Sequence, residues 1–195
     1  MTTMTTSKAR WLRRLAYVPR WTVMPTLQSQ SVAEHTFHVI VLCRWLVSQH
    51  AEKDTGNFEL DVLRLALEHD ADEAKSGDIP TPHKHGTPDE QQGRFTDENV
   101  QGLSHLEMSQ AEVVVKCADK LEAILFVHQE MLMGNNYGTR QLLDDVETRF
   151  SMIWDKFEQE GKIKTPWYVV IEAAKSISYS NHSPHPAMES GNYGD

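Results

Sequence analysis

Apolar residues recur every three or four positions along most of this chain, which is the spacing that gives an α-helix one apolar face. Ser31-Val32-Ala33-Glu34 has the capping-box pattern that starts a helix, in which the serine and the glutamate satisfy each other's backbone N–H groups. No segment shows the alternation of a half-buried strand. We therefore expect an all-α bundle, with its main helices over residues 31–50, 59–69, 104–133, 139–159 and 165–177.

The composition limits the partners of this chain. Its 195 residues suffice for one domain, which we expect over residues 1–180, with a disordered polar tail over 181–195. A net charge of -9 argues against binding to a nucleic acid polymer or an anionic membrane. No apolar run approaches the ~20 residues of a membrane span, and Met1–Lys8 lacks the apolar stretch of a secretory signal. Cys43 and Cys117 lie on apolar helical patterns, as buried thiols of a cytoplasmic protein do.

A dense group of metal-binding residue types stands at the end of the apolar segment 59–69. His69 and Asp70 are adjacent, and Glu73 and Asp78 follow shortly after them. Neighbouring helical residues point about 100° apart, yet a histidine and an aspartate in sequence can hold one cation, because both reach a common point with bonds of about 2 Å. The alternative is a polar helix end with solvated carboxylates, and the dipeptide alone does not decide between the two.

Two further segments offer ligands of the same kind. His35 lies in the first turn of the helix that Ser31 opens, where the helix dipole favours the neutral imidazole that binds metals. The alternative for this residue is a hydrogen-bonded core histidine, and His38, one turn on, fits an orienting or packing role. Asp119 lies among apolar residues, where a carboxylate is costly unless it is paired or coordinated. An ion pair with Lys116 at the surface is the alternative for Asp119.

Candidate contacts for a nucleotide lie outside these helices. Arg20-Trp21 stands in a loop between two prolines, where a tryptophan ring can pack on a base and a guanidinium can bind a phosphate. A loop tryptophan is also a common core anchor. Lys84, in a loop rich in glycine and proline, could bind a polyphosphate or stand in solvent. The first helix carries three arginines that form either a solvated face or part of an anion funnel: Arg10, Arg13 and Arg14.

The order of these residues, His…His-Asp…Asp, resembles the signature of the HD-domain phosphohydrolases. The resemblance extends to the 5′-deoxynucleotidase branch and equally to the related phage dATP triphosphohydrolases. It implies a single-domain HD-type helical bundle. The stretches that carry it lie between about residues 10 and 130 and are Arg20-Trp21, Ser31–His35, His69–Glu73, Ser76–Pro82 and Lys116–Asp119.

The resemblance implies a divalent metal site. Two neutral imidazoles and two carboxylates form a suitable shell for Zn²⁺, Mn²⁺ or Co²⁺. An additional Mg²⁺ that accompanies a polyphosphate is left open. The residues that match the family's metal ligands are His35, His69, Asp70 and Asp119.

The same resemblance assigns roles around the substrate. Glu73 matches the acidic residue that activates or positions the attacking water, and Asp78 matches a second carboxylate near the substrate. Arg20 matches a phosphate contact, and Trp21 a residue that packs on the base or sugar. Further candidates for phosphate binding are Lys84 and Lys116.

A metal-dependent deoxynucleotide phosphohydrolase is the activity that the resemblance implies. The chain has no Cys or Ser nucleophile with a partnered base and no Gly-rich phosphate loop, which favours direct attack by water. The favoured reaction converts dATP and water to deoxyadenosine and triphosphate by attack on the α-phosphorus, because the segment between Asp70 and Asp119 is compact relative to the bacterial 5′-deoxynucleotidases. The alternative is a 5′-deoxynucleotidase that releases phosphate from deoxynucleoside monophosphates. Val23 could crowd the purine 2-position and exclude a 2-amino group.

Two other classes of protein compete with the enzyme. A non-catalytic HD module would bind a nucleotide and regulate a partner, but it has no chemical need for Glu73. A structural helical oligomerisation protein would respond to metal chelation only in its stability. The resemblance also implies a homo-oligomer, located in the host cytoplasm if the protein is encoded by a phage.

Overall fold

The computed structural model describes residues 4–50, 56–78, 109–159 and 165–179. These residues are helical apart from their turns and loops, and the only β-bridge among them joins Pro19 to Ser31. The predicted all-α fold is therefore confirmed. The elements are α1 (Thr6–Arg14), the 3₁₀ turn η1 (Leu15–Tyr17), α2 (Val32–His50), α3 (Gly56–Glu68), α4 (Glu73–Ser76), α6 (Gln110–Leu132), α7 (Thr139–Gln159) and α8 (Trp167–Tyr179).

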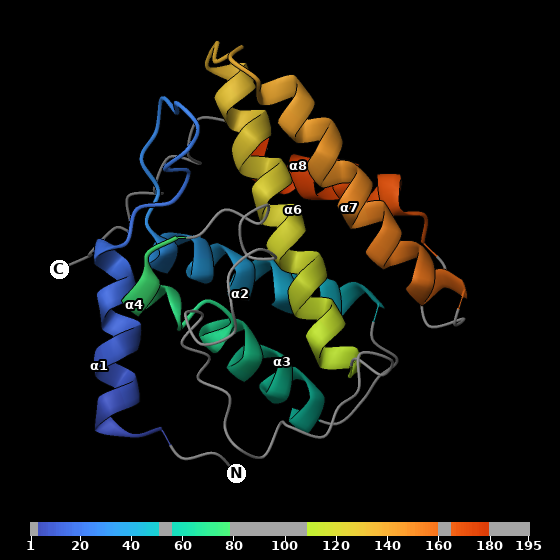
Figure 1. The fold of residues 1–195 in the computed structure, drawn as a ribbon. Coiled ribbons are helices and arrows are strands. Elements are labelled where there is room, and N and C mark those ends of the chain that lie inside the picture. The colour runs from blue at the N-terminus through green and yellow to red at the C-terminus, as the bar shows by residue number, and fades with distance from the viewer. Residues whose placement is uncertain (1–3, 51–55, 79–108, 160–164, 180–195) are drawn as a thin grey trace, which may run out of the picture.

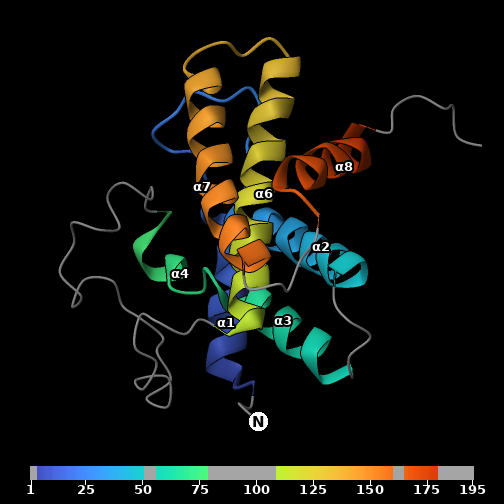
Figure 2. The ribbon, with the colours of Figure 1, turned by 90° about the vertical axis from the view of Figure 1, so that its right-hand side faces the viewer.

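Helix α6 is the centre of the bundle. It packs against α2, α3, α7 and α8 (Figure 1). Helices α6 and α7 run antiparallel and side by side (Figure 2), and α8 packs against both of them. The turn between α6 and α7 contains Gly134 and Gly138 with φ of +97° and +68°, a backbone conformation that side chains with a Cβ rarely adopt.

The core lies where α6 meets these neighbours. Trp154 and Phe150 of α7 stack with their ring centroids 5.4 Å apart, and Leu121 and Ile124 of α6 are fully buried. Trp154 also donates its Nε1–H to the carbonyl oxygen of Thr165 at 2.8 Å, which satisfies the polar atom of a buried ring.

Cys43 and Cys117 are free thiols in this core, as the sequence predicts. Burial raises the pKa of each to about 12. Both cysteines are therefore neutral packing residues at physiological pH and not nucleophiles.

Helix α2 begins with the predicted capping box. Ser31 N donates to Glu34 Oε2 at 2.6 Å, and Glu34 N donates to Ser31 Oγ at 3.2 Å. Helix α6 begins with a second capping box, formed by Ser109 and Glu112, which the sequence analysis missed. The predicted start of this helix near Ser104 lies outside the described residues.

The segment between η1 and α2 is fixed against the start of α2 and the end of α6. Its two ends pair with each other, because Arg20 N donates to the carbonyl of Gln30 at 2.8 Å. Its tip is held by Glu130 of α6, whose buried carboxylate accepts hydrogen bonds from Leu27 N at 2.7 Å and Gln28 N at 2.9 Å. This anchoring places Arg20 and Trp21 at one side of α6. We call residues 18–31 the clamp loop.

None of the helices within residues 4–50, 56–78, 109–159 and 165–179 is both long enough and apolar enough to cross a membrane.

Candidate metal centre and adjoining cavity

Four side chains from α2, α6 and the turn after α3 converge on one point. His35 Nε2 lies 3.2 Å from His69 Nε2, 3.3 Å from Asp119 Oδ1 and 3.5 Å from Asp70 Oδ2. His69 Nε2 lies 3.2 Å from Asp70 Oδ2. Atoms that share one tetrahedral cation at about 2.0–2.1 Å lie about 3.3 Å from one another. Three of the predicted ligands, His35, His69 and Asp119, therefore have the spacing of a single-cation site. Asp70 lies beside the two histidines, with Oδ2 3.5 Å from His35 Nε2 and 3.2 Å from His69 Nε2.

The end of α3 explains how adjacent residues face the same centre. The helix ends at Glu68, and the chain turns so that Ala71 N donates to the carbonyl of Glu68 at 3.1 Å. His69 and Asp70 lie in this turn. Their side chains are therefore not held about 100° apart, as adjacent residues of a regular helix are. The Nδ1–H of His69 donates to the carbonyl of Ala66 at 2.7 Å, which leaves Nε2 for the cluster.

The electrostatics of the cluster favour a bound cation. Burial opposes a charge on His35, but Glu122, Asp119 and Asp70 outweigh it and raise the pKa of the imidazole to about 10. Burial would raise the pKa of Asp119, but His35 and Lys120 hold it well below its usual range. The surroundings thus stabilise positive charge between these side chains, and a divalent ion can take the place of the proton.

Glu122 is a member of the site that the sequence analysis missed. It is 3% exposed, and it accepts a hydrogen bond from His35 Nδ1 at 2.6 Å and from Gln30 Nε2 at 2.6 Å. Burial would raise its pKa, but the charge on His35 lowers it to about 2. Glu122 lies three residues after Asp119 on the same helix, so the two share a face of α6. A carboxylate at that spacing within an apolar pattern was the signal that could have identified it.

A cavity of about 380 Å³ adjoins the cluster, which is within the size range of small-molecule sites. Asp70 and Asp119 belong to both the cluster and the cavity wall. The clamp loop forms one wall and α7 contributes another, although the sequence offered no motif after residue 139. Its lining also includes Arg20, Trp21, Val23, Glu73, Asp78, Lys120 and Arg149.

The two predicted acidic residues both line this cavity. Glu73 is 3% exposed and is the first residue of the short helix α4, so it reaches the cavity from a separate helix and not from one turn further along α3. Asp78 Oδ2 accepts a hydrogen bond from the backbone N–H of Trp21 at 3.1 Å. Trp21 has a φ of 61°, which is uncommon for a residue with a side chain, and Asp78 stabilises that conformation.

Trp21 packs against the core and also lines the cavity. Its ring stacks on Phe126 of the core, with centroids 5.0 Å apart and an interplanar angle of 8°. The same residue lines the cavity, beside Arg20. Arg20 Nη1 is buried and makes no hydrogen bond within the described part of the chain, although Glu122 Oε2 lies 3.7 Å away. This guanidinium therefore has hydrogen-bonding capacity for a ligand.

The other residues predicted to contact the substrate differ in their position relative to the cavity. Lys116 is exposed and is not among the residues that line the cavity. Its neighbour on α6, Lys120, lines the cavity and places Nζ 2.8 Å from Asp119 Oδ2. Val23 also lines the cavity and is 70% exposed, as expected for a residue at its mouth. Lys84 lies outside the described residues.

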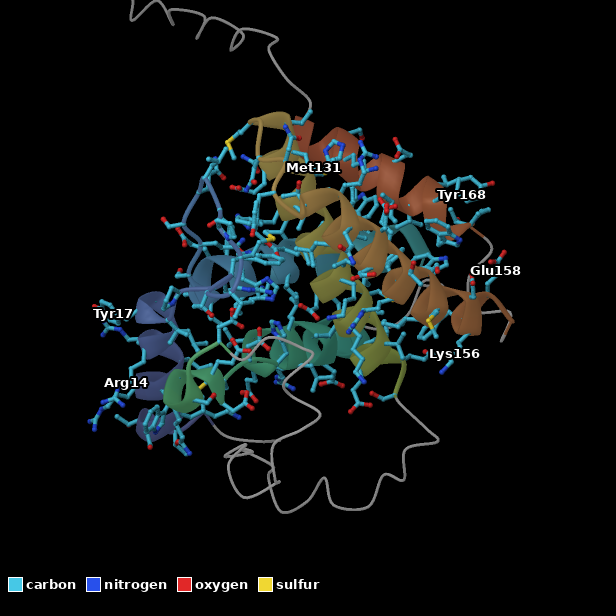
Figure 3. All side chains as sticks on the ribbon, turned by 45° about the horizontal axis from the view of Figure 1, so that its top comes forward. Arg14, Tyr17, Met131, Lys156, Glu158 and Tyr168 are labelled. Carbon is cyan, nitrogen blue, oxygen red and sulfur yellow. The ribbon has the colours of Figure 1, made fainter. Side chains whose placement is uncertain are left out.

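The arginines of α1 do not form an anion funnel into this cavity. None of the three lines it. Arg14 stands over the ring of Trp11, 4.5 Å from its centroid, and projects from the outer side of α1 (Figure 3). The solvated-face interpretation of these arginines fits the structure.

Several known proteins are similar to this chain in sequence, in fold or in both. The model of the 5′-deoxynucleotidase YfbR-like family matches residues 9–94. A dATP triphosphohydrolase of cyanophage S-2L is 31% identical over 67% of this chain and 75% of its own length. A dATP triphosphohydrolase of Salmonella phage PMBT28 is 34% identical over 75% of this chain and 78% of its own length. A 5′-deoxynucleotidase of Photorhabdus temperata is 29% identical over 75% of this chain and 86% of its own length.

Two solved structures have the same fold. The HD phosphohydrolase of cyanophage S-2L, bound to dA and one catalytic Zn²⁺ ion, aligns with a TM-score of 0.60 at 19% identity, over 89% of this chain and 99% of its own. An HD-domain phosphohydrolase of Listeria innocua aligns with a TM-score of 0.56 at 14% identity, over 88% of this chain and 84% of its own. With two phage relatives above 30% identity over at least 75% of their lengths, the chain belongs to the YfbR-like family of HD-type deoxynucleotide phosphohydrolases.

Proposed function

We propose that this protein is a metal-dependent dATP triphosphohydrolase that converts dATP and water to deoxyadenosine and triphosphate. The observation that carries the proposal is the convergence of His35, His69 and Asp119 at cation-sharing distances, with Asp70 beside the two histidines and a cavity next to the cluster. This donor set suits Zn²⁺, Mn²⁺ or Co²⁺. The residues that would hold the ion are His35, His69, Asp70 and Asp119.

The residues around the metal site have separate roles in the proposed reaction. A divalent ion bound at the cluster supplies Lewis-acid polarisation of a phosphoryl oxygen and lowers the pKa of water. Glu73, buried beside Asp70 on the cavity wall, accepts the proton of the attacking water. Arg20 lines the cavity and offers its guanidinium to the phosphate, where it stabilises the charge that develops in the transition state. Asp78 keeps Trp21 in the conformation that lets the clamp loop face the substrate.

Three cationic side chains of the cavity support a polyphosphate substrate, and they lie among five carboxylates that also line it: Asp70, Glu73, Asp78, Asp119 and Asp145. Arg20 on the clamp loop, Lys120 on α6 and Arg149 on α7 approach the cavity from three different elements. A monophosphate needs fewer cations, whereas the β- and γ-phosphates of dATP extend beyond the α-phosphorus and need further positive charge. Lys120 and Arg149 take the role expected of Lys116 in this proposal, and Lys84 lies outside the described residues.

The base specificity is assigned to Val23. Its side chain lines the mouth of the cavity two residues after Trp21, whose aromatic ring packs beside the base or sugar. Val23 then crowds the 2-position of the purine, which accepts the hydrogen of adenine and rejects the amino group of guanine.

A 5′-deoxynucleotidase is the second candidate, because the family model that matches residues 9–94 bears that name. The test incubates the Mn²⁺-, Co²⁺- or Zn²⁺-loaded protein with dATP, dAMP and ATP in H₂¹⁸O and analyses the products by ³¹P NMR and mass spectrometry. The proposal expects triphosphate from dATP, with ¹⁸O in the triphosphate and none in deoxyadenosine. Phosphate released from dAMP without turnover of dATP would establish the second candidate. If the protein binds the cation but hydrolyses none of the deoxynucleotides, the result would favour a non-catalytic, nucleotide-binding HD module.

A further inference from the structure

We propose that Glu122 is a positioning residue that fixes the tautomer of His35 and connects the metal cluster to the clamp loop. The proposal rests on the cation site of the proposed function. Glu122 does not itself belong to the cluster: its carboxylate contacts the side of the His35 ring opposite to Nε2. Its other oxygen contacts Gln30 at the end of the clamp loop.

A chain of hydrogen bonds runs from the clamp loop to the cluster, and the donor and acceptor of each bond in it can be assigned. Trp21 Nε1–H can only donate, and it donates to Gln30 Oε1 at 3.1 Å. This contact fixes the orientation of the Gln30 amide, so its NH₂ group faces Glu122 and donates to Oε1 at 2.6 Å. Glu122 must therefore accept on this side.

The second oxygen of Glu122 completes the chain. Oε2 lies 2.6 Å from His35 Nδ1. An ionised carboxylate has no proton to donate, so His35 Nδ1 carries a hydrogen. When a cation displaces the proton of Nε2, that nitrogen presents its lone pair to the cluster. Nε2 is the atom that lies 3.3 Å from Asp119 Oδ1 and 3.2 Å from His69 Nε2. Carboxylates in this position hold the ring orientation of metal-binding histidines and raise their basicity.

A carboxylate is the group that satisfies the two hydrogen-bond donors at residue 122, His35 Nδ1 and Gln30 Nε2, and His38 Nδ1 also lies 3.5 Å from Oε1. A glutamine there would have one acceptor and one NH₂ group, but both neighbours are donors, so either His35 or Gln30 would face a second donor. The negative charge also lies 3.7 Å from the buried Arg20 Nη1, which belongs to the cavity wall. Glu122 thus holds the ring of His35 and the guanidinium of Arg20 in one arrangement.

The experiment measures cation affinity in the absence of nucleotide, by competition with a chromophoric chelator for Zn²⁺ and by the visible spectrum of bound Co²⁺. Glu122→Gln should weaken binding by about 10- to 100-fold and alter the Co²⁺ spectrum, and Glu122→Ala should weaken it at least as much. The matched control is Glu147→Gln, the same substitution at a half-buried glutamate of α7 that pairs with Lys175, away from the clamp loop and the cluster, and it should leave the affinity unchanged. Wild-type affinity in a folded Glu122→Gln protein would overturn the proposal.

A second measurement needs no variant. In the ¹⁵N NMR spectrum of the Zn²⁺-loaded wild-type protein, His35 should carry its hydrogen on Nδ1, and a hydrogen on Nε2 would overturn the proposal. The two measurements distinguish a failure of this proposal from a failure of the proposed function. A wild-type protein that binds no divalent cation would remove the proposed function as a whole, whereas normal cation binding with an unaffected Glu122→Gln variant would remove only the role of Glu122.

Discussion

The carboxylate of Asp78 holds the backbone of Trp21: Asp78 Oδ2 accepts a hydrogen bond from Trp21 N at 3.1 Å across 57 residues of sequence. This contact joins the segment that follows α4 to the clamp loop, on the wall of the cavity. It also supports the positive φ of Trp21, which would otherwise be strained.

Asp78→Ala should therefore impair substrate binding more than the chemical step. Loss of a hydrogen bond to a charged group lets the loop relax, and we expect KM for the deoxynucleotide to rise about 10-fold or more with a smaller change in kcat. Steady-state kinetics measure both constants. Asp78→Asn keeps an acceptor oxygen and should recover part of the loss. A fall in kcat at constant KM would assign Asp78 to the chemistry instead.

Glu130→Ala should destabilise the protein. Glu130 is fully buried and accepts hydrogen bonds from Leu27 N, Gln28 N and Asn135 Nδ2 at 2.7, 2.9 and 2.7 Å. Its removal leaves buried donors without an acceptor, and we expect a loss of about 3–5 kcal/mol in the free energy of unfolding. Urea unfolding measures this loss. Glu130→Gln should cost less, and equal stability of Glu130→Ala and the wild-type protein would mean that the clamp loop is held by other contacts.

The stabilisation by a divalent cation should increase with pH. The pKa of His35 is raised to about 10 in the cation-free protein, so its protonation stabilises the fold fully below pH 6.5 and this contribution is lost as the pH rises toward 10. A cation must also displace that proton, which makes its binding tighter at higher pH. The difference in Tm between cation-loaded and EDTA-treated protein should be larger at pH 9 than at pH 6.5. A difference that is constant or shrinks with pH contradicts this account of the cluster.

Val23→Gly should broaden the base specificity. Val23 is 70% exposed, so the substitution costs little stability while it removes the side chain from the cavity mouth. The ratio of kcat/KM for dGTP to that for dATP should rise, and Val23→Ala should give an intermediate ratio. If both variants keep the wild-type ratio, the base is selected elsewhere in the cavity.

Glu73→Gln should retain the cation and lose turnover. The amide has nearly the same shape as the carboxylate but cannot accept a proton from water, and we expect kcat to fall by about 10²- to 10⁴-fold. Cation content by elemental analysis and kcat by product release are the two measurements. Turnover near the wild-type rate would show that another group takes the proton.

Sequence patterns predicted the features that depend on local spacing. The capping box Ser31–Glu34 marks the start of α2, and this start places His35 in the first turn of the helix. The order of His35, His69, Asp70 and Asp119 carried the family resemblance, and the structure brings the four side chains together.

Features that depend on tertiary packing were harder to predict. The hydrogen-bond partners of Glu122 are Gln30 and His35, which are 92 and 87 residues away in the sequence. Lys116 and Lys120 look equivalent beside Asp119 in the sequence, and only the rotation of α6 in the bundle brings Lys120 to the cavity. Arg149 belongs to an amphipathic helix without a motif, so its place on the cavity wall follows from the packing of α7 on α6 alone.

The most direct test of the central claim is the anomalous diffraction of crystals of the protein loaded with Zn²⁺, recorded at the zinc absorption edge. We predict one strong peak within about 2.0–2.2 Å of four atoms: Nε2 of His35, Nε2 of His69, and one carboxylate oxygen each from Asp70 and Asp119. A zinc peak elsewhere in the protein, or one at the cluster with Asp119 turned out of bonding reach, would contradict the account.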